Sequence, residues 1–110
     1  MQYIATLALM LVFFSNWSVN AEEISEELVL SIGDRDYGEY LSSECTACHQ
    51  LSGEENGIPS ITNWPLDSFA ISLLSYKNGD REHPIMGMIA KRLSKEEIAS
   101  LAIFFNSLNN

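Results

Sequence analysis

Apolar residues recur at helical spacing along much of the chain, and no segment alternates in the manner of a β-strand. The clearest pattern lies near the carboxyl end. Its apolar positions, which would form one buried stripe on a helix, are Ile98, Leu101, Ala102, Phe105 and Leu108. The run from Ser94 to Glu97 predicts where this helix starts, because a cap serine followed three residues later by glutamate can form a capping box.

Earlier segments show the same helical character. One helix is predicted over residues 34–44, with Gly33 as a possible start, and a short helical turn over residues 88–92 precedes the last helix. The run Gly53, Gly57 and Pro59 is typical of a loop. Since every predicted element is a helix, the predicted fold class is all-α.

A middle helix is predicted between two local signals. Pro65 introduces it and Asp67 caps it, because an aspartate carboxylate can accept hydrogen bonds from the free amides of a first turn. Asn78-Gly79 ends it, as glycine readily adopts the left-handed conformation found after helices.

The first residues have a different character. Residues 4–14 are apolar apart from Thr6, a run too short to span a bilayer but of suitable length for the core of a signal peptide. Short residues at 19–21 suit a signal peptidase, so we predict a signal peptide over residues 1–21 and one domain over residues 22–110. Gln2 and Tyr3 contribute no positive charge, which leaves an uncleaved membrane anchor as the alternative.

Candidate chemistry is concentrated in Cys45-Thr46-Ala47-Cys48-His49. Two cysteines separated by two residues and followed directly by histidine form the attachment motif of c-type haem. Thiols about one helical turn apart can each add to a vinyl group of the porphyrin, while the histidine lies under the iron. Attachment of this haem takes place outside the cytoplasm, so the motif and the signal peptide together predict a periplasmic protein.

Other interpretations of the two cysteines were considered. A thioredoxin-type redox pair requires a βαβ context, and no apolar β-branched strand precedes Cys45. Zinc usually takes four ligands, whereas the chain has only these cysteines, His49 and the distant His83. A disulfide between Cys45 and Cys48 would close a very small loop and remove little entropy from the unfolded chain.

Charge is unevenly distributed. The whole net charge of −9 comes from residues 22–55, which hold ten acidic residues and one basic residue, Arg35. A chain this acidic is a poor candidate for binding nucleic acid. The acidic part can serve as a solvated surface or can steer a basic partner. The remaining basic residues, expected to ring the edge of the cofactor, are Lys77, Arg81, Lys91, Arg92 and Lys95.

The order of helix, haem motif, proline-containing loop, middle helix, methionine segment and final amphipathic helix resembles class I cytochrome c. Residues 76–81, 85–91 and 94–98 resemble the cytochrome subunit of flavocytochrome c sulfide dehydrogenase and, more loosely, cytochrome c4. Gln50 and Arg92 depart from the sulfide dehydrogenase pattern, in which glycine is common at these positions. Those subunits also often carry two haems, whereas this chain has one motif.

The resemblance implies roles for particular residues. Cys45 and Cys48 would form thioether bonds to one haem c, and His49 would bind the iron with its second ring nitrogen held by the carbonyl of Pro59. Gly38 and Leu41 would lie where the first helix crosses the last, near Leu101 and Phe105.

The sixth iron ligand implied by the resemblance is Met86. Met88 is interpreted as a packing residue, and His83, restricted by the following Pro84, as a lead-in to the methionine segment. Trp64 and Tyr76 could either hydrogen-bond the haem propionates or belong to the core.

An iron with histidine and methionine ligands has no open position, so the implied function is electron transfer and the chain would not be an enzyme by itself. The expected form is a periplasmic carrier with redox protein partners. The alternative is a subunit that accepts electrons from a flavoprotein sulfide dehydrogenase. A sensor or ligand-binding haem protein would require that no methionine binds the iron. Contact with a membrane is expected only if the signal segment is retained.

Overall fold

The computed structural model describes residues 23–108, and every regular element in that range is a helix. The described helices, in order, are α1 (Glu26–Ile32), α2 (Arg35–Leu41), α3 (Ser43–Thr46), α4 (Leu66–Asn78), α5 (Pro84–Lys91) and α6 (Lys95–Asn106). The predicted all-α fold class is confirmed. The predicted signal peptide, residues 1–21, lies outside the described residues, and none of the described helices has the length and apolar character needed to cross a bilayer.

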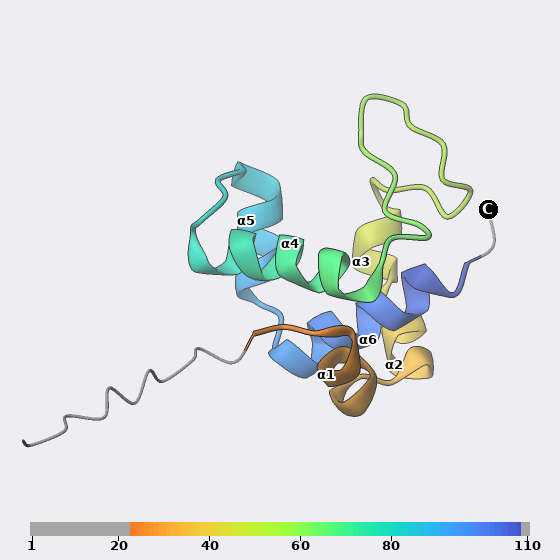
Figure 1. The fold of residues 1–110 in the computed structure, drawn as a ribbon. Helices are drawn as coiled ribbons and strands as arrows, with labels where there is room; N and C mark the ends of the chain where they lie inside the picture. Colours follow the sequence, from red (N-terminus) through yellow and green to blue (C-terminus); the bar gives the residue numbers. More distant parts are fainter. Residues whose placement is uncertain (1–22, 109–110) are drawn as a thin grey trace, which may run out of the picture.

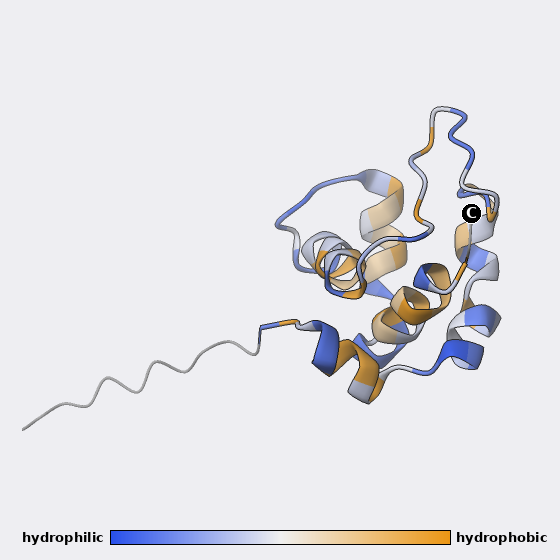
Figure 2. Cartoon of the chain, turned by 45° about the vertical axis from the view of Figure 1, so that its right-hand side comes forward, coloured by the Kyte–Doolittle hydropathy of each residue, from blue (hydrophilic) through white to orange (hydrophobic). Residues whose placement is uncertain are grey.

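Helix α6 forms the centre of the fold and contacts α1, α2 and α4 (Figure 1). Most of its predicted stripe is buried: Ile98 and Leu101 are 1% exposed and Phe105 is 0% exposed. Leu108, the last predicted position, lies beyond the end of α6 and is only partly buried. The buried surface is wider than that stripe, because Ser100 and Phe104 are also buried. Figure 2 shows apolar residues on α6 and on the sides of the helices that face it, with polar residues along α2 and the loops.

Helices α2 and α6 cross at Gly38. A Cβ atom added there would lie 2.6 Å from the carbonyl carbon of Ser100, still closer to its oxygen, and 2.9 Å from Cβ of Phe104. The crossing predicted at Gly38 is therefore present. The atoms nearest to the added Cβ belong to Ser100 and Phe104, which directly precede the predicted Leu101 and Phe105 on α6.

The segment before the haem motif differs from the prediction in two ways. Helix α1 was not predicted; Ser25 caps it, and Val29, 1% exposed, packs into the core. The predicted helix over residues 34–44 is divided at Ser42, whose amide bonds to the Glu39 carbonyl at 3.2 Å in a tighter turn. Asp34, and not Gly33, provides the cap of α2.

Two other helix starts were predicted too late. Helix α4 begins at Leu66 with Pro65 as its cap residue, so the predicted cap at Asp67 is wrong; this carboxylate accepts from the Ser68 amide within the first turn, at 2.8 Å. Burial of Leu66, 7% exposed, explains the earlier start. Helix α5 begins at Pro84, four residues before the predicted turn. Gly79 ends α4 with φ 84°, as predicted.

The capping box at the start of α6 is present as predicted. Ser94 Oγ accepts from the Glu97 amide at 3.1 Å, and the Ser94 amide donates to Glu97 Oε1 at 2.9 Å. The hydrogen bond from the Ser94 backbone holds the pKa of Glu97 below its usual value, although partial burial acts in the opposite direction. The ionised carboxylate is therefore the form that stabilises the helix start.

We expect Glu97→Gln to lower the free energy of unfolding at neutral pH, by about 1 kcal/mol or less, and to lose this effect in acid. A carboxyl group with a lowered folded-state pKa stabilises the fold above its unfolded pKa of about 4.3, and this contribution disappears as the pH falls through the folded value. Denaturant unfolding at neutral and acidic pH measures the difference. Glu96→Gln, in the same turn but outside the capping box, is the control. If Glu97→Gln still had a lower free energy of unfolding in strong acid, the role of the carboxylate would be contradicted.

Candidate functional site

A cavity of about 430 Å³ opens between the cysteine motif, the loop that follows it, α4 and α5. Figure 1 shows α3 near the first residues of α4 and α5 near its last residues, with the long loop beside α3. The apolar side chains that line the cavity include Ile58, Ile61, Phe69, Leu73, Ile89 and Leu93. This space therefore suits a large apolar group.

The motif forms a single turn at one wall of the cavity. The amides of Cys48 and His49 both donate to the carbonyl of Cys45, at 3.1 and 2.8 Å. This turn extends the short helix α3, and it places both sulfur atoms and the imidazole of His49 among the lining side chains.

The imidazole of His49 is oriented by the loop. Its Nδ1 lies 2.6 Å from the carbonyl oxygen of Pro59, the contact that the resemblance implied. A carbonyl can only accept a hydrogen bond, so Nδ1 carries the proton and Nε2 keeps a free lone pair. The ring is thus held in the tautomer that can bind a metal through Nε2.

Met86 and Met88 differ in position although they share α5. Met86 is half-buried and lines the cavity, whereas Met88 is 59% exposed and lies outside the lining. His83 also lines the cavity, but its Nδ1 accepts from the amides of Ile85 and Met86 at 3.3 Å and so caps α5. An Nδ1 that accepts leaves the proton of the neutral ring on Nε2, which is then a poor metal ligand.

Trp64 and Tyr76 both line the cavity. The carbonyl of Trp64 accepts from Asn106 Nδ2 at 2.7 Å, which joins this wall to the end of α6. Arg81, one of the basic residues expected at the edge of the cofactor, lines the cavity as well, and its guanidinium lies 4.7 Å from the centre of the Tyr76 ring.

Two residues of the predicted basic ring make contacts within the fold. Lys77 Nζ donates to the carbonyls of Lys91 and Leu93, at 3.2 and 2.6 Å. Arg92 pairs with Glu44 at 3.7 Å. Of the five predicted residues, Arg81 is the one among the side chains that line the cavity. The docking role expected of the basic residues stays a prediction.

The structure argues against the other chemistries considered for the cysteines. Burial, with a smaller contribution from the charge of Glu44, raises the pKa of Cys45 to about 11, whereas a reactive redox thiol needs a lowered pKa. Among the described residues, no three His, Cys, Asp or Glu side chains gather into a metal site. The thiols and the imidazole face an apolar space that a macrocycle can fill.

Comparison with known proteins bears on this site. The chain is 37% identical to the cytochrome subunit of sulfide dehydrogenase of Chlorobaculum tepidum over 73 residues. The aligned residues make up 66% of each chain. It is 34% identical over 71 residues to cytochrome c-553 of Helicobacter pylori, covering 62% of this chain and 74% of the relative. The chain belongs to the class I cytochromes c.

A third relative is larger. The thiosulfate dehydrogenase electron acceptor of Thiomonas intermedia is 30% identical over 70 residues, which is 61% of this chain but 32% of the relative. The chain thus spans about a third of that protein and about two thirds of the Chlorobaculum subunit. No protein-family model matches the chain.

Membership of the cytochromes c confirms several expectations. The cofactor is a covalently attached haem c, the function is electron transfer between redox partners, and the cytochrome is not an enzyme by itself. The residues present suit this cofactor: an apolar cavity, two thiols and a histidine at one wall, and one cation at its edge. When bound, haem supplies an iron that takes up and releases one electron.

Proposed function

We propose that this cytochrome is a periplasmic electron carrier with one haem c, attached to Cys45 and Cys48, whose iron is bound by His49 and Met86. The observation that carries the proposal is that all four side chains line one cavity, with His49 on the motif turn and Met86 on α5. The motif turn and α5 are separate segments of the fold (Figure 1), so the two ligands would approach the cavity from different elements.

The chain's own residues would set the properties of the iron. The Pro59 carbonyl orients His49 and makes its Nε2 more basic. A methionine thioether is a soft ligand that favours ferrous iron and so raises the reduction potential. With both axial positions filled, the iron has no site for a substrate. Arg81, Tyr76 and Trp64 are proposed to surround the haem propionates, where Arg81 supplies the opposite charge.

The assignment of Met86 is tested by the weak absorption band near the red end of the visible spectrum that reports an iron–methionine bond in the oxidised state. We expect Met86→Ala to lose this band and Met88→Ala to keep it, because only Met86 lines the cavity. His83→Ala should keep the band but weaken the start of α5. If the band survives in Met86→Ala, or is missing from the unmodified protein, the assignment of Met86 as an iron ligand is wrong.

Export is proposed from the sequence of residues 1–21, with cleavage after Ala21. The amino-terminal sequence of the haem-loaded protein tests this: a chain that begins at Glu22 and is recovered from the periplasm supports it, and one that begins at Met1 in the membrane fraction supports the anchor.

A second candidate function is that of an electron-accepting subunit for a flavoprotein sulfide dehydrogenase, which the name of the Chlorobaculum relative favours. A flavoprotein that oxidises sulfide would have to reduce this cytochrome and bind it during purification. Reduction that requires no such protein would favour the independent carrier.

A further inference from the structure

An exposed aromatic pair stands on the outer side of α2. The rings of Tyr37 and Tyr40 are stacked, with centroids 6.3 Å apart and planes at 14°, and the residues are 43% and 78% exposed. Gly38, on the other side of the helix, is buried against α6. Aromatic rings left together in water often mark an interaction surface.

A groove of about 330 Å³ lies beside Tyr40 of this pair. Tyr40 lines it from α2, and Leu93 and Glu97 line it from the junction between α5 and α6. Glu44 and Leu93 line both this groove and the haem cavity. The groove and the cavity therefore share a wall, and a partner seated in the groove lies close to the cofactor.

Carboxylates surround the tyrosines. The side chains of Asp36 and Glu39 on α2 are 92% and 60% exposed, and that of Glu44 is 56% exposed. The Tyr37 hydroxyl donates to Glu97 Oε2 at 3.3 Å. The surface thus combines aromatic faces with several exposed negative charges.

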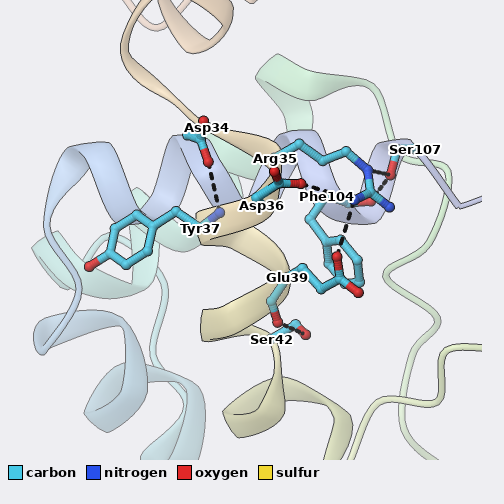
Figure 3. A network of polar contacts seen from close by, with 8 residues as sticks. All are labelled: Asp34, Arg35, Asp36, Tyr37, Glu39, Ser42, Phe104 and Ser107. Carbon is cyan, nitrogen blue, oxygen red and sulfur yellow. Dashed lines mark hydrogen bonds and ion pairs between the residues drawn. The ribbon is translucent and has the colours of Figure 1, made fainter.

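The two arginines near this surface are paired with acids of the same chain. Arg35 bonds to Glu39 at 3.2 Å and lies over the Phe104 ring, and Figure 3 shows Tyr37 pointing away from this network. Arg92 pairs with Glu44 at 3.7 Å within the groove.

We propose that this tyrosine–acid surface, formed by Tyr37, Tyr40, Glu44 and Glu97, docks a basic surface of a redox partner whose arginine or lysine side chains enter the groove. A cation over the face of Tyr40 and beside Glu44 gains from the ring quadrupole and from the carboxylate. The net charge of −9 steers a basic protein toward it and repels a second copy of this chain. The proposal does not depend on which residues bind the iron.

The test is an amide NMR titration of the reduced, haem-loaded protein with a short arginine peptide. Shifts should concentrate on α2, α3 and Leu93 and should fade as salt rises, since charges are screened over about 8 Å at physiological ionic strength. Tyr40→Ala should weaken binding about two- to fivefold, the effect of an exposed cation–π contact. Arg92→Gln should strengthen it, because it removes a cation from the groove.

Two variants serve as matched controls. Leu30→Ala removes a side chain that is 56% exposed on α1, and Glu54→Gln removes an acid from the loop after the motif. Neither should change the affinity, and an unchanged visible spectrum shows that each variant is folded. The proposal would be overturned if Leu30→Ala and Tyr40→Ala lost equal affinity for the arginine peptide, or if a glutamate peptide bound equally well. Amide shifts confined to α5 and the loop would overturn it as well.

Discussion

Gly38→Ala should destabilise the protein more than any other single methyl group added to its helices. The new Cβ would overlap the carbonyl of Ser100, with 2.6 Å to the carbonyl carbon and less to the oxygen. Main-chain atoms of α6 cannot turn aside as a flexible side chain can, so α2 must move away from α6. Overpacking of this kind costs about 1–3 kcal/mol, and we expect a loss at the upper end of that range or beyond it in denaturant unfolding of the haem-loaded protein.

Gly87→Ala is the matched control, since this glycine also lies within a helix but an added Cβ would meet no atom within 4 Å. Alanine is favoured over glycine in helices by about 1 kcal/mol, so this variant should be equally or more stable. If Gly38→Ala unfolds at the same denaturant concentration as the unmodified protein, the close crossing of α2 and α6 is wrong.

The double change Cys45→Ser and Cys48→Ser should make all of the haem extractable. In the unmodified protein, denaturation and acidified acetone should leave haem on the chain, because thioether bonds survive conditions that break iron ligation. Each of the single variants Cys45→Ser and Cys48→Ser should retain at most one thioether bond to haem. A domain of this size buries a modest core, and much of its interior is a cavity that the cofactor fills. The double variant should therefore also unfold at a much lower denaturant concentration.

His49→Ala provides the contrast for this experiment, because it removes a proposed iron ligand and leaves both sulfur atoms in place. Its haem should resist extraction while its spectrum changes. Haem that leaves the denatured unmodified protein would rule out covalent attachment through these cysteines.

Features encoded by neighbouring residues were predicted well. The capping box of Ser94 and Glu97 and the left-handed end at Gly79 depend on a few adjacent groups, and both are present. The haem motif is equally local, since five consecutive residues define it. Membership of the cytochromes c confirmed the cofactor that it implied.

Features that depend on distant residues were predicted less well. Helix α1 was not predicted, because it depends on the packing of Val29 against core residues that lie far away in the sequence. Helix α5 starts early because the ring of His83 accepts from its first amides, and helical spacing does not reveal such a cap.

The packing of α1 and α2 on α6 has a consequence for the order of events during synthesis. The Asp34 amide donates to Ser100 Oγ at 2.9 Å, a bond between residues 66 positions apart. A ribosome delivers the amino-terminal helices long before α6, so their apolar sides have no partner until the last residues are made. The motif of Cys45 and Cys48 lies inside this unclosed loop. We therefore expect haem to be attached after export and before α6 packs against α1 and α2, while the chain around both thiols is still open.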